Sequence, residues 1–95
     1  MQLEELEKII QERIKSKTEN SYTYELIKSG LDRLVQKVGE ESIETVIAAK
    51  NDNLEAFRNE VADLIYHILV LLQYKNSSLL DIEKVLDKRH NSKVK

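Results

Sequence analysis

Four acidic residues form two pairs with the same spacing. Glu41 and Glu44 are three residues apart, and so are Glu60 and Asp63. On a helix this spacing places both side chains of a pair on one face. The segments that carry the pairs are separated only by the short polar break at residues 51–53. Two antiparallel neighbouring helices would therefore bring the four acids together.

Converging carboxylates repel one another unless a cation lies between them. Asp63 lies in a run of apolar residues, so we expect its charge to be buried, which is costly when unpaired. A hard divalent ion removes both problems, and ligands made only of oxygen suit Mg²⁺ or Mn²⁺. For Glu41 and Glu44 alone, a solvated helix face remains the ordinary alternative. The joint pattern predicts a magnesium site for phosphoryl chemistry, held by Glu41, Glu44, Glu60 and Asp63.

Basic residues precede and follow the first acidic pair. Lys37, one turn before Glu41, is a candidate to bind a substrate phosphate or to pair with Glu41. Arg33 lies one further turn back, where a solvated position is the alternative. Lys50 ends the same predicted helix, where a cation also favours the helix dipole. All three are candidate contacts for a phosphorylated substrate.

Two residues beside the acids are candidates for supporting roles. Glu40 is next to the cluster and is the candidate acceptor for a proton from the attacking water, although an exposed position without a role is the alternative. His67 lies one turn after Asp63. We interpret it as a hydrogen-bonded residue that orients Asp63 rather than as a ligand, because histidine is a poor ligand for Mg²⁺.

The apolar spacing predicts that these residues lie on helices. Apolar residues recur at steps of three and four, which is typical of helices with one buried face. Ser21 or Thr23 can cap a short helix that ends near Gly30, and Ser78 can cap the last one. The predicted helices cover residues 3–14, about 21–30, 31–50, 54–74 and about 78–90.

Length and composition favour one all-α domain. The chain has 95 residues, no proline, no cysteine and only two glycines, which are too few for the turns of a β-rich domain. A net charge of −2 offers no basic surface for nucleic acid. No leader peptide or membrane-spanning run is evident, so we expect a cytoplasmic protein without a membrane partner. The expected domain covers residues 1–90, and residues 91–95 form a polar tail.

The segment from Val61 to Leu72 is apolar around nearly its whole circumference. A helix of this kind is buried on every side, and a chain of this length can hardly enclose it. A second subunit is therefore expected to supply one wall. Two-fold homodimers are the commonest solution. The predicted fold is a bundle of four to five helices that is completed by dimerisation.

Several segments, taken together, resemble the phosphoribosyl-ATP pyrophosphatases of histidine biosynthesis. This family belongs to the MazG-type all-α nucleotide pyrophosphohydrolases. The resemblance extends from about Leu3 to His90. The segments that carry it are Ser21-Tyr22-Thr23, Gly30-Leu31-Asp32-Arg33, Gln36-Lys37-Val38-Gly39-Glu40-Glu41, Ala48-Ala49-Lys50-Asn51 and the residues from Glu60 to His67.

The resemblance implies a MazG-like helical dimer and a Mg²⁺-dependent reaction. The reaction is hydrolysis of the α–β phosphoanhydride of phosphoribosyl-ATP, which gives phosphoribosyl-AMP and pyrophosphate. The family's acidic motif maps onto Glu41, Glu44, Glu60 and Asp63. The family also suggests substrate contacts from Ser21, Tyr22 and Thr23, for which helix capping is the alternative.

Two other functions remain open at the level of the sequence. One is a housecleaning pyrophosphatase that acts on ordinary or damaged NTPs and dNTPs with the same acidic cluster. The other is a non-catalytic helical dimerisation module whose acids are merely solvated.

Overall fold

The computed structural model describes residues 1–92, and the residues it describes form five α-helices and no strand. The helices are α1 (Leu3–Ser16), α2 (Tyr22–Ser29), α3 (Leu31–Ala49), α4 (Leu54–Tyr74) and α5 (Leu79–His90). The all-α prediction is confirmed, and the predicted helix ends agree with the structure to within two residues. Of the predicted tail at 91–95, residues 93–95 lie outside the described part of the chain.

Short polar side chains begin three of the helices. Ser21, Asn53 and Ser78 precede α2, α4 and α5, and the side-chain oxygen of each accepts a backbone N–H three residues further on, at 3.3, 3.0 and 3.1 Å. Each cap satisfies one of the N–H groups that a helix start leaves without a partner. Gly30 joins α2 directly to α3 with φ +96°, a conformation that favours glycine.

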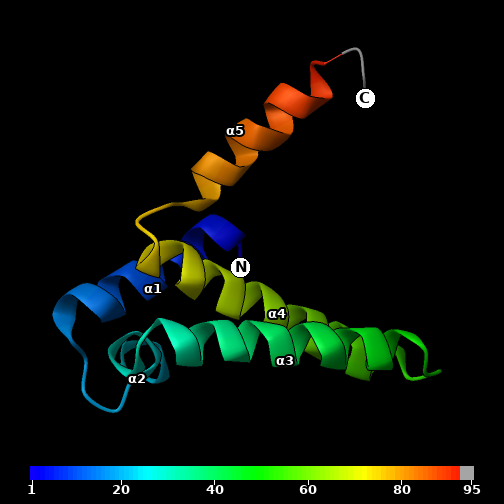
Figure 1. Cartoon of the computed structure of the whole chain (residues 1–95), viewed down its shortest axis with the longest axis horizontal. Helices are drawn as coiled ribbons and strands as arrows, with labels where there is room; N and C mark the ends of the chain where they lie inside the picture. Colours follow the sequence, from blue (N-terminus) through cyan, green and yellow to red (C-terminus); the bar gives the residue numbers. More distant parts are fainter. Residues whose placement is uncertain (93–95) are drawn as a thin grey trace.

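The long helices α3 and α4 run side by side in opposite directions, joined by the turn at residues 50–53, and α1 and α2 pack at one end of the pair (Figure 1). The buried core lies at that end. It consists of Ile10, Leu26, Leu34, Leu69 and Val70, which come from all four helices. The other end of the α3–α4 pair extends beyond this core towards the turn.

The single chain does not enclose α4. His67, Leu69 and Val70 are buried, but Ile68 is 39% exposed and Ala62 is also exposed. The reason is that α1 and α2 cover only the C-terminal half of α4, and α3 covers one flank. None of the described helices is long and apolar enough to cross a bilayer.

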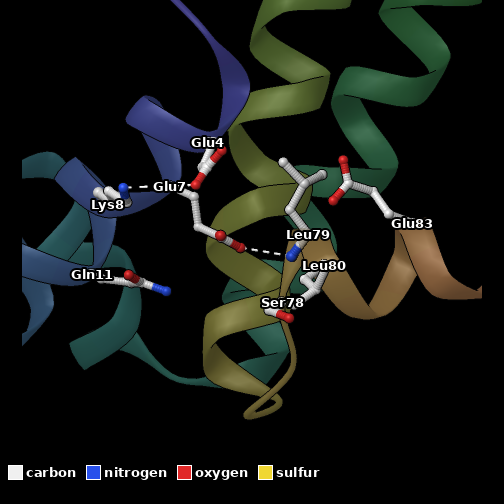
Figure 2. Close-up of a pocket in the computed structure, with 8 residues that line it drawn as sticks. All are labelled: Glu4, Glu7, Lys8, Gln11, Ser78, Leu79, Leu80 and Glu83. Atoms are coloured by element: carbon white, nitrogen blue, oxygen red, sulfur yellow. Dashed lines mark hydrogen bonds and ion pairs between the residues drawn. The ribbon is translucent and has the colours of Figure 1, made fainter.

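The last helix stands apart from the four-helix bundle. No residue of α5 is buried, and in Figure 1 it projects away from the other helices. Its start is held by Glu7 of α1, whose carboxylate Oε2 accepts the backbone N–H of Leu79 at 2.7 Å and the amide of Gln73 at 3.2 Å. Figure 2 shows the Glu7–Leu79 bond in a pocket of about 350 Å³ between α1 and the start of α5.

Replacing Glu7 should release α5 from the bundle. Glu7→Ala leaves the Leu79 N–H without its acceptor, so we expect a loss of about 1–3 kcal/mol in the free energy of unfolding. Urea denaturation measures it. The matched control is Glu4→Ala, which removes an exposed ion pair with Lys8 and should cost less than about 1 kcal/mol. Equal losses for both variants would contradict this role of Glu7.

Candidate metal centre

Three of the predicted ligands meet between α3 and α4. One carboxylate oxygen from each of Glu41, Glu60 and Asp63 lies within 4.8 Å of the others. Glu41 comes from the middle of α3, and the other two come from one turn of α4. The antiparallel arrangement of the two helices therefore achieves the convergence that the spacing predicts.

The fourth acid, Glu44, contacts the same group one turn along α3. A hydrogen bond shared with the Glu44 carboxyl is the main reason why the pKa of Glu60 is raised, followed by burial. The pKa of Glu41 is also raised, first by burial and then by the charges of Glu44 and Asp63. Both shifts mean that the cluster disfavours the charged forms of Glu41 and Glu60 when no cation is bound.

The cluster has buried oxygens that no protein group satisfies. Glu41 is 8% exposed. Within the described residues, Oε2 of Glu41 and Oε2 of Glu60 are buried and have no hydrogen-bond partner. Buried polar atoms are nearly always paired, and each exception calls for an explanation. A hard divalent cation bound by oxygen ligands satisfies both atoms and offsets the mutual repulsion, so the donor set fits such an ion.

Asp63 is not the buried charge that the sequence led us to expect. Its side chain is exposed in this chain, because it lies on a part of α4 that α1 and α2 do not cover. The apolar neighbours of Asp63 in sequence point to other sides of the helix, so they do not surround it. The cost of burial therefore falls on Glu41 and Glu60, on the flank where α3 and α4 meet.

His67 contacts the main chain of Asp63 rather than its carboxylate. Nδ1 of His67 lies 2.7 Å from the carbonyl oxygen of Asp63, and Nε2 lies 2.8 Å from the hydroxyl of Tyr22. His67 is 6% exposed, so both ring nitrogens are satisfied within the protein. The proposed orientation of Asp63 would thus act through the backbone of α4.

Lys37 and Glu40 interact with each other along α3. Nζ of Lys37 lies 3.7 Å from Oε1 of Glu40, so the ion pair of Lys37 is formed with Glu40 and not with Glu41. Glu40 also accepts the side-chain amide of Gln36 at 3.1 Å. Glu40 is exposed and does not belong to the converging group. Lys37 is nevertheless close enough to lower the pKa of Glu41 in part.

The other two cations lie at opposite ends of α3. Arg33 and Lys37 both act on Tyr22, whose pKa is raised by burial and lowered in part by these two charges. Arg33 and Lys37 are therefore on the side of the cluster that faces α2. Lys50 is exposed just beyond the end of α3, where its backbone N–H bonds to the carbonyl of Ile47. It lies six residues beyond Glu44, about 9 Å along the helix axis.

The Ser21-Tyr22-Thr23 segment is bonded mainly within the protein. Ser21 caps α2, and Thr23 is fully buried with its hydroxyl bonded to the hydroxyl of Tyr66. Tyr22 is 50% exposed although its hydroxyl is bonded to His67. Sequence reasoning did not single out Tyr66. The available signal was a tyrosine beside a histidine in an otherwise apolar helix.

Comparison with known proteins is consistent with this geometry. The profile of the family described as phosphoribosyl-ATP pyrophosphohydrolase matches residues 3–90. The chain belongs to this family. The match includes the whole acidic cluster and the α2 segment that packs beside it.

Curated relatives of this family are similar along almost the whole chain. A phosphoribosyl-ATP pyrophosphatase of Clostridium acetobutylicum is 50% identical over 97% of this chain and 83% of its own length. A phosphoribosyl-ATP pyrophosphatase of Pyrobaculum calidifontis is 47% identical over 92% of this chain and 93% of its own length. The histidine biosynthesis bifunctional protein HisIE of Bacillus subtilis is 46% identical over 94% of this chain, but over only 43% of its own length.

The raised pKa values predict how stability changes with pH. A carboxyl whose folded-state pKa lies above its ordinary value of 4.5 favours folding below that value, and this stability is lost as the pH rises through the raised pKa. In chelator, the wild-type unfolding midpoint should therefore fall relative to that of Glu41→Gln as the pH rises towards neutral. Adding Mg²⁺ at neutral pH should raise the midpoint of the wild type more than that of the variant.

Thermal unfolding followed by circular dichroism measures both effects. Glu55→Gln, which changes an exposed acid in the first turn of α4, should follow the wild type. If the curves of wild type and Glu41→Gln stay parallel from acidic to neutral pH, the electrostatic account of the cluster is wrong.

Proposed function

We infer that this chain hydrolyses phosphoribosyl-ATP at its α–β phosphoanhydride, which gives phosphoribosyl-AMP and pyrophosphate for histidine biosynthesis. The observation that carries this proposal is the convergence of Glu41, Glu60 and Asp63 with two buried, unpaired oxygens. The substrate comes from the names of the family and of its curated relatives. The proposed catalytic domain is residues 1–90, and 91–95 is a tail. A multiply charged nucleotide does not cross a bilayer unaided, so we place the reaction in the cytoplasm.

The proposed cofactor is Mg²⁺, with Mn²⁺ as a substitute. Glu41, Glu44, Glu60 and Asp63 would hold it, because they supply only oxygen ligands and two of their buried oxygens lack any other partner. When bound, the ion neutralises polyphosphate charge and makes water a better nucleophile at neutral pH. The four acids would hold the ion between α3 and α4.

Cations on α3 are proposed to bind the phosphates of the substrate. Lys37 and Arg33 lie one and two turns before Glu41, beside Tyr22. Lys37 presents a point charge to phosphate, and Arg33 presents a planar fork. Lys50 is proposed to bind a more distant part of the substrate, since it lies beyond the other end of the cluster.

Glu40 is the proposed acceptor of the proton lost by the attacking water. Its carboxylate is exposed and paired with Lys37. A phosphate that attracts Lys37 would free Glu40 to take the proton, so substrate binding and base activation would be linked. In the Ser21-Tyr22-Thr23 segment, internal bonds occupy the hydroxyls of Ser21 and Thr23. The substrate contact proposed there falls mainly to the exposed part of Tyr22.

Hydrolysis by the purified chain tests the proposed function. Pyrophosphate release from phosphoribosyl-ATP should need Mg²⁺ and stop with chelator. Glu60→Gln and Asp63→Asn should each lower the rate by about 100-fold or more, whereas Glu55→Gln should not. A panel of NTPs and dNTPs serves as the comparison. Preference for a plain dNTP would favour the housecleaning function, and no turnover of any nucleotide would favour the dimerisation module.

We also propose that the chain forms a homodimer through the outer face of α3. Val35, Ile43 and Val46 line this face and are 44%, 63% and 64% exposed. Gly39 lies in the same stripe, and a Cβ added there would contact nothing within 4 Å of it in this chain. A glycine inside a helix costs about 1 kcal/mol relative to alanine. Close approach by a second copy would explain why it is present.

A charge placed in this stripe should separate the subunits. Ile43→Glu should convert a dimer into a monomer, because it would bury an unpaired carboxylate in the interface. Sedimentation equilibrium measures the mass of each species. Lys15→Gln changes the net charge by the same amount at an exposed position on α1 and should leave the dimer intact. A wild-type chain that is monomeric at high micromolar concentration would contradict the proposal.

A further inference from the structure

Two residues at the start of α2 pair one to one with two residues of α4. The Tyr22 hydroxyl bonds to Nε2 of His67, and the Thr23 hydroxyl bonds to the hydroxyl of Tyr66. The aromatic rings also contact each other, with the centroids of Tyr22 and His67 5.7 Å apart at an interplanar angle of 84°. The start of α2 is thus joined to α4 by two neighbouring hydrogen bonds.

Only the Tyr22–His67 bond continues towards the acidic cluster. A carbonyl oxygen accepts hydrogen bonds and cannot donate them, so the 2.7 Å contact to Asp63 requires a proton on Nδ1 of His67. In the neutral ring Nε2 is then the acceptor, and the Tyr22 hydroxyl donates to it. A directed chain of two bonds therefore runs from the Tyr22 hydroxyl through His67 to the main chain of Asp63.

The position of Asp63 depends on these two hydrogen bonds more than the positions of the other acids do. Its side chain is exposed, and no hydrogen bond holds its carboxylate within the described residues. Glu41, in contrast, is buried between the helices. The position of the Asp63 carboxylate is therefore set by the turn of α4 on which it stands. The buried His67 donates a hydrogen bond to the carbonyl oxygen of Asp63 in that turn.

We propose that Tyr22 and His67 are positioning residues that hold the Asp63 turn of α4 ready to bind the divalent cation, with the Asp63 carbonyl fixing the tautomer of His67 and the Tyr22 hydroxyl bonded to its Nε2. This proposal rests on the metal site of the proposed function. In this proposal Tyr22 supports His67 through a hydrogen bond, in addition to any contact with the substrate. The adjacent Thr23–Tyr66 bond joins the same two helices but does not reach Asp63. A variant that loses this bond therefore shows what weaker packing of α2 on α4 does by itself.

The experiment measures Mn²⁺ binding to the full chain by electron paramagnetic resonance, without substrate. His67→Asn carries an amide nitrogen as many bonds from Cβ as Nδ1 and can still donate to the Asp63 carbonyl. His67→Gln places its nitrogen at the distance of Nε2 and loses that bond. We expect His67→Gln to weaken Mn²⁺ binding by about 10–100-fold. Tyr22→Phe and His67→Asn, which each lose only the Tyr22–His67 bond, should weaken it less, and Tyr66→Phe should remain close to the wild type.

Kinetics provide a second readout. In His67→Gln and Tyr22→Phe, the Mg²⁺ concentration for half-maximal turnover should rise. In His67→Gln, KM for phosphoribosyl-ATP at saturating Mg²⁺ should change little. Tyr24→Phe is the control within α2. Its hydroxyl takes part in no hydrogen bond within the described residues. A purely structural loss would appear in thermal unfolding and not in the Mg²⁺ dependence.

The outcomes separate this proposal from the proposed function. If the wild type binds no Mn²⁺, the metal site itself is wrong. If the wild type binds Mn²⁺ and Tyr22→Phe and His67→Gln bind it equally well, only the positioning role is overturned. The role is also overturned if Tyr66→Phe weakens binding as much as Tyr22→Phe does, or if His67→Asn is as weak as His67→Gln. Should His67→Gln fail to fold, Tyr22→Phe alone still decides between these results.

Discussion

Mutual repulsion among carboxylates on facing helices is the constraint on which the rest of this structure depends. Glu41 and Glu60 lie in the seam between α3 and α4, where the pKa of Glu60 is raised first by the Glu44 carboxyl and that of Glu41 first by burial. Among the residues that the structure describes, no side chain satisfies the buried Oε2 atoms of Glu41 and Glu60 at this seam. The helices therefore bring together acids whose charges oppose one another, and a dication bound there would relieve that cost.

The remaining helices supply the stability that such a site needs. The core side chains from Ile10 to Val70 lie at one end of the α3–α4 pair, away from the acids. This separation leaves the acidic cluster outside the closely packed core. Sites that are electrostatically unfavourable by themselves are commonly supported in this way by better-packed parts of the fold.

The start of α2 links these two regions. Thr23 is buried against Tyr66, whereas Tyr22 lies partly exposed between His67 and the cations of α3. Tyr22 and Thr23 thus attach α2 to α4 and lie beside the acidic cluster. The Ser21-Tyr22-Thr23 segment therefore has a structural task in addition to any contact with the substrate.

The sequence by itself determined the helices and the acidic pairs. Apolar periodicity and the caps at Ser21 and Ser78 are local signals, and a spacing of three residues places two side chains on one face whatever the surroundings. Only the tertiary structure decided which residues are exposed and which atoms meet. Asp63 is exposed because neither α1 nor α2 reaches its side of α4, and Lys37 pairs with Glu40 because of how their side chains lie along α3. The bonds of His67 to Tyr22 and to the Asp63 carbonyl depend on where α2 packs, and no local pattern in the chain encodes that position.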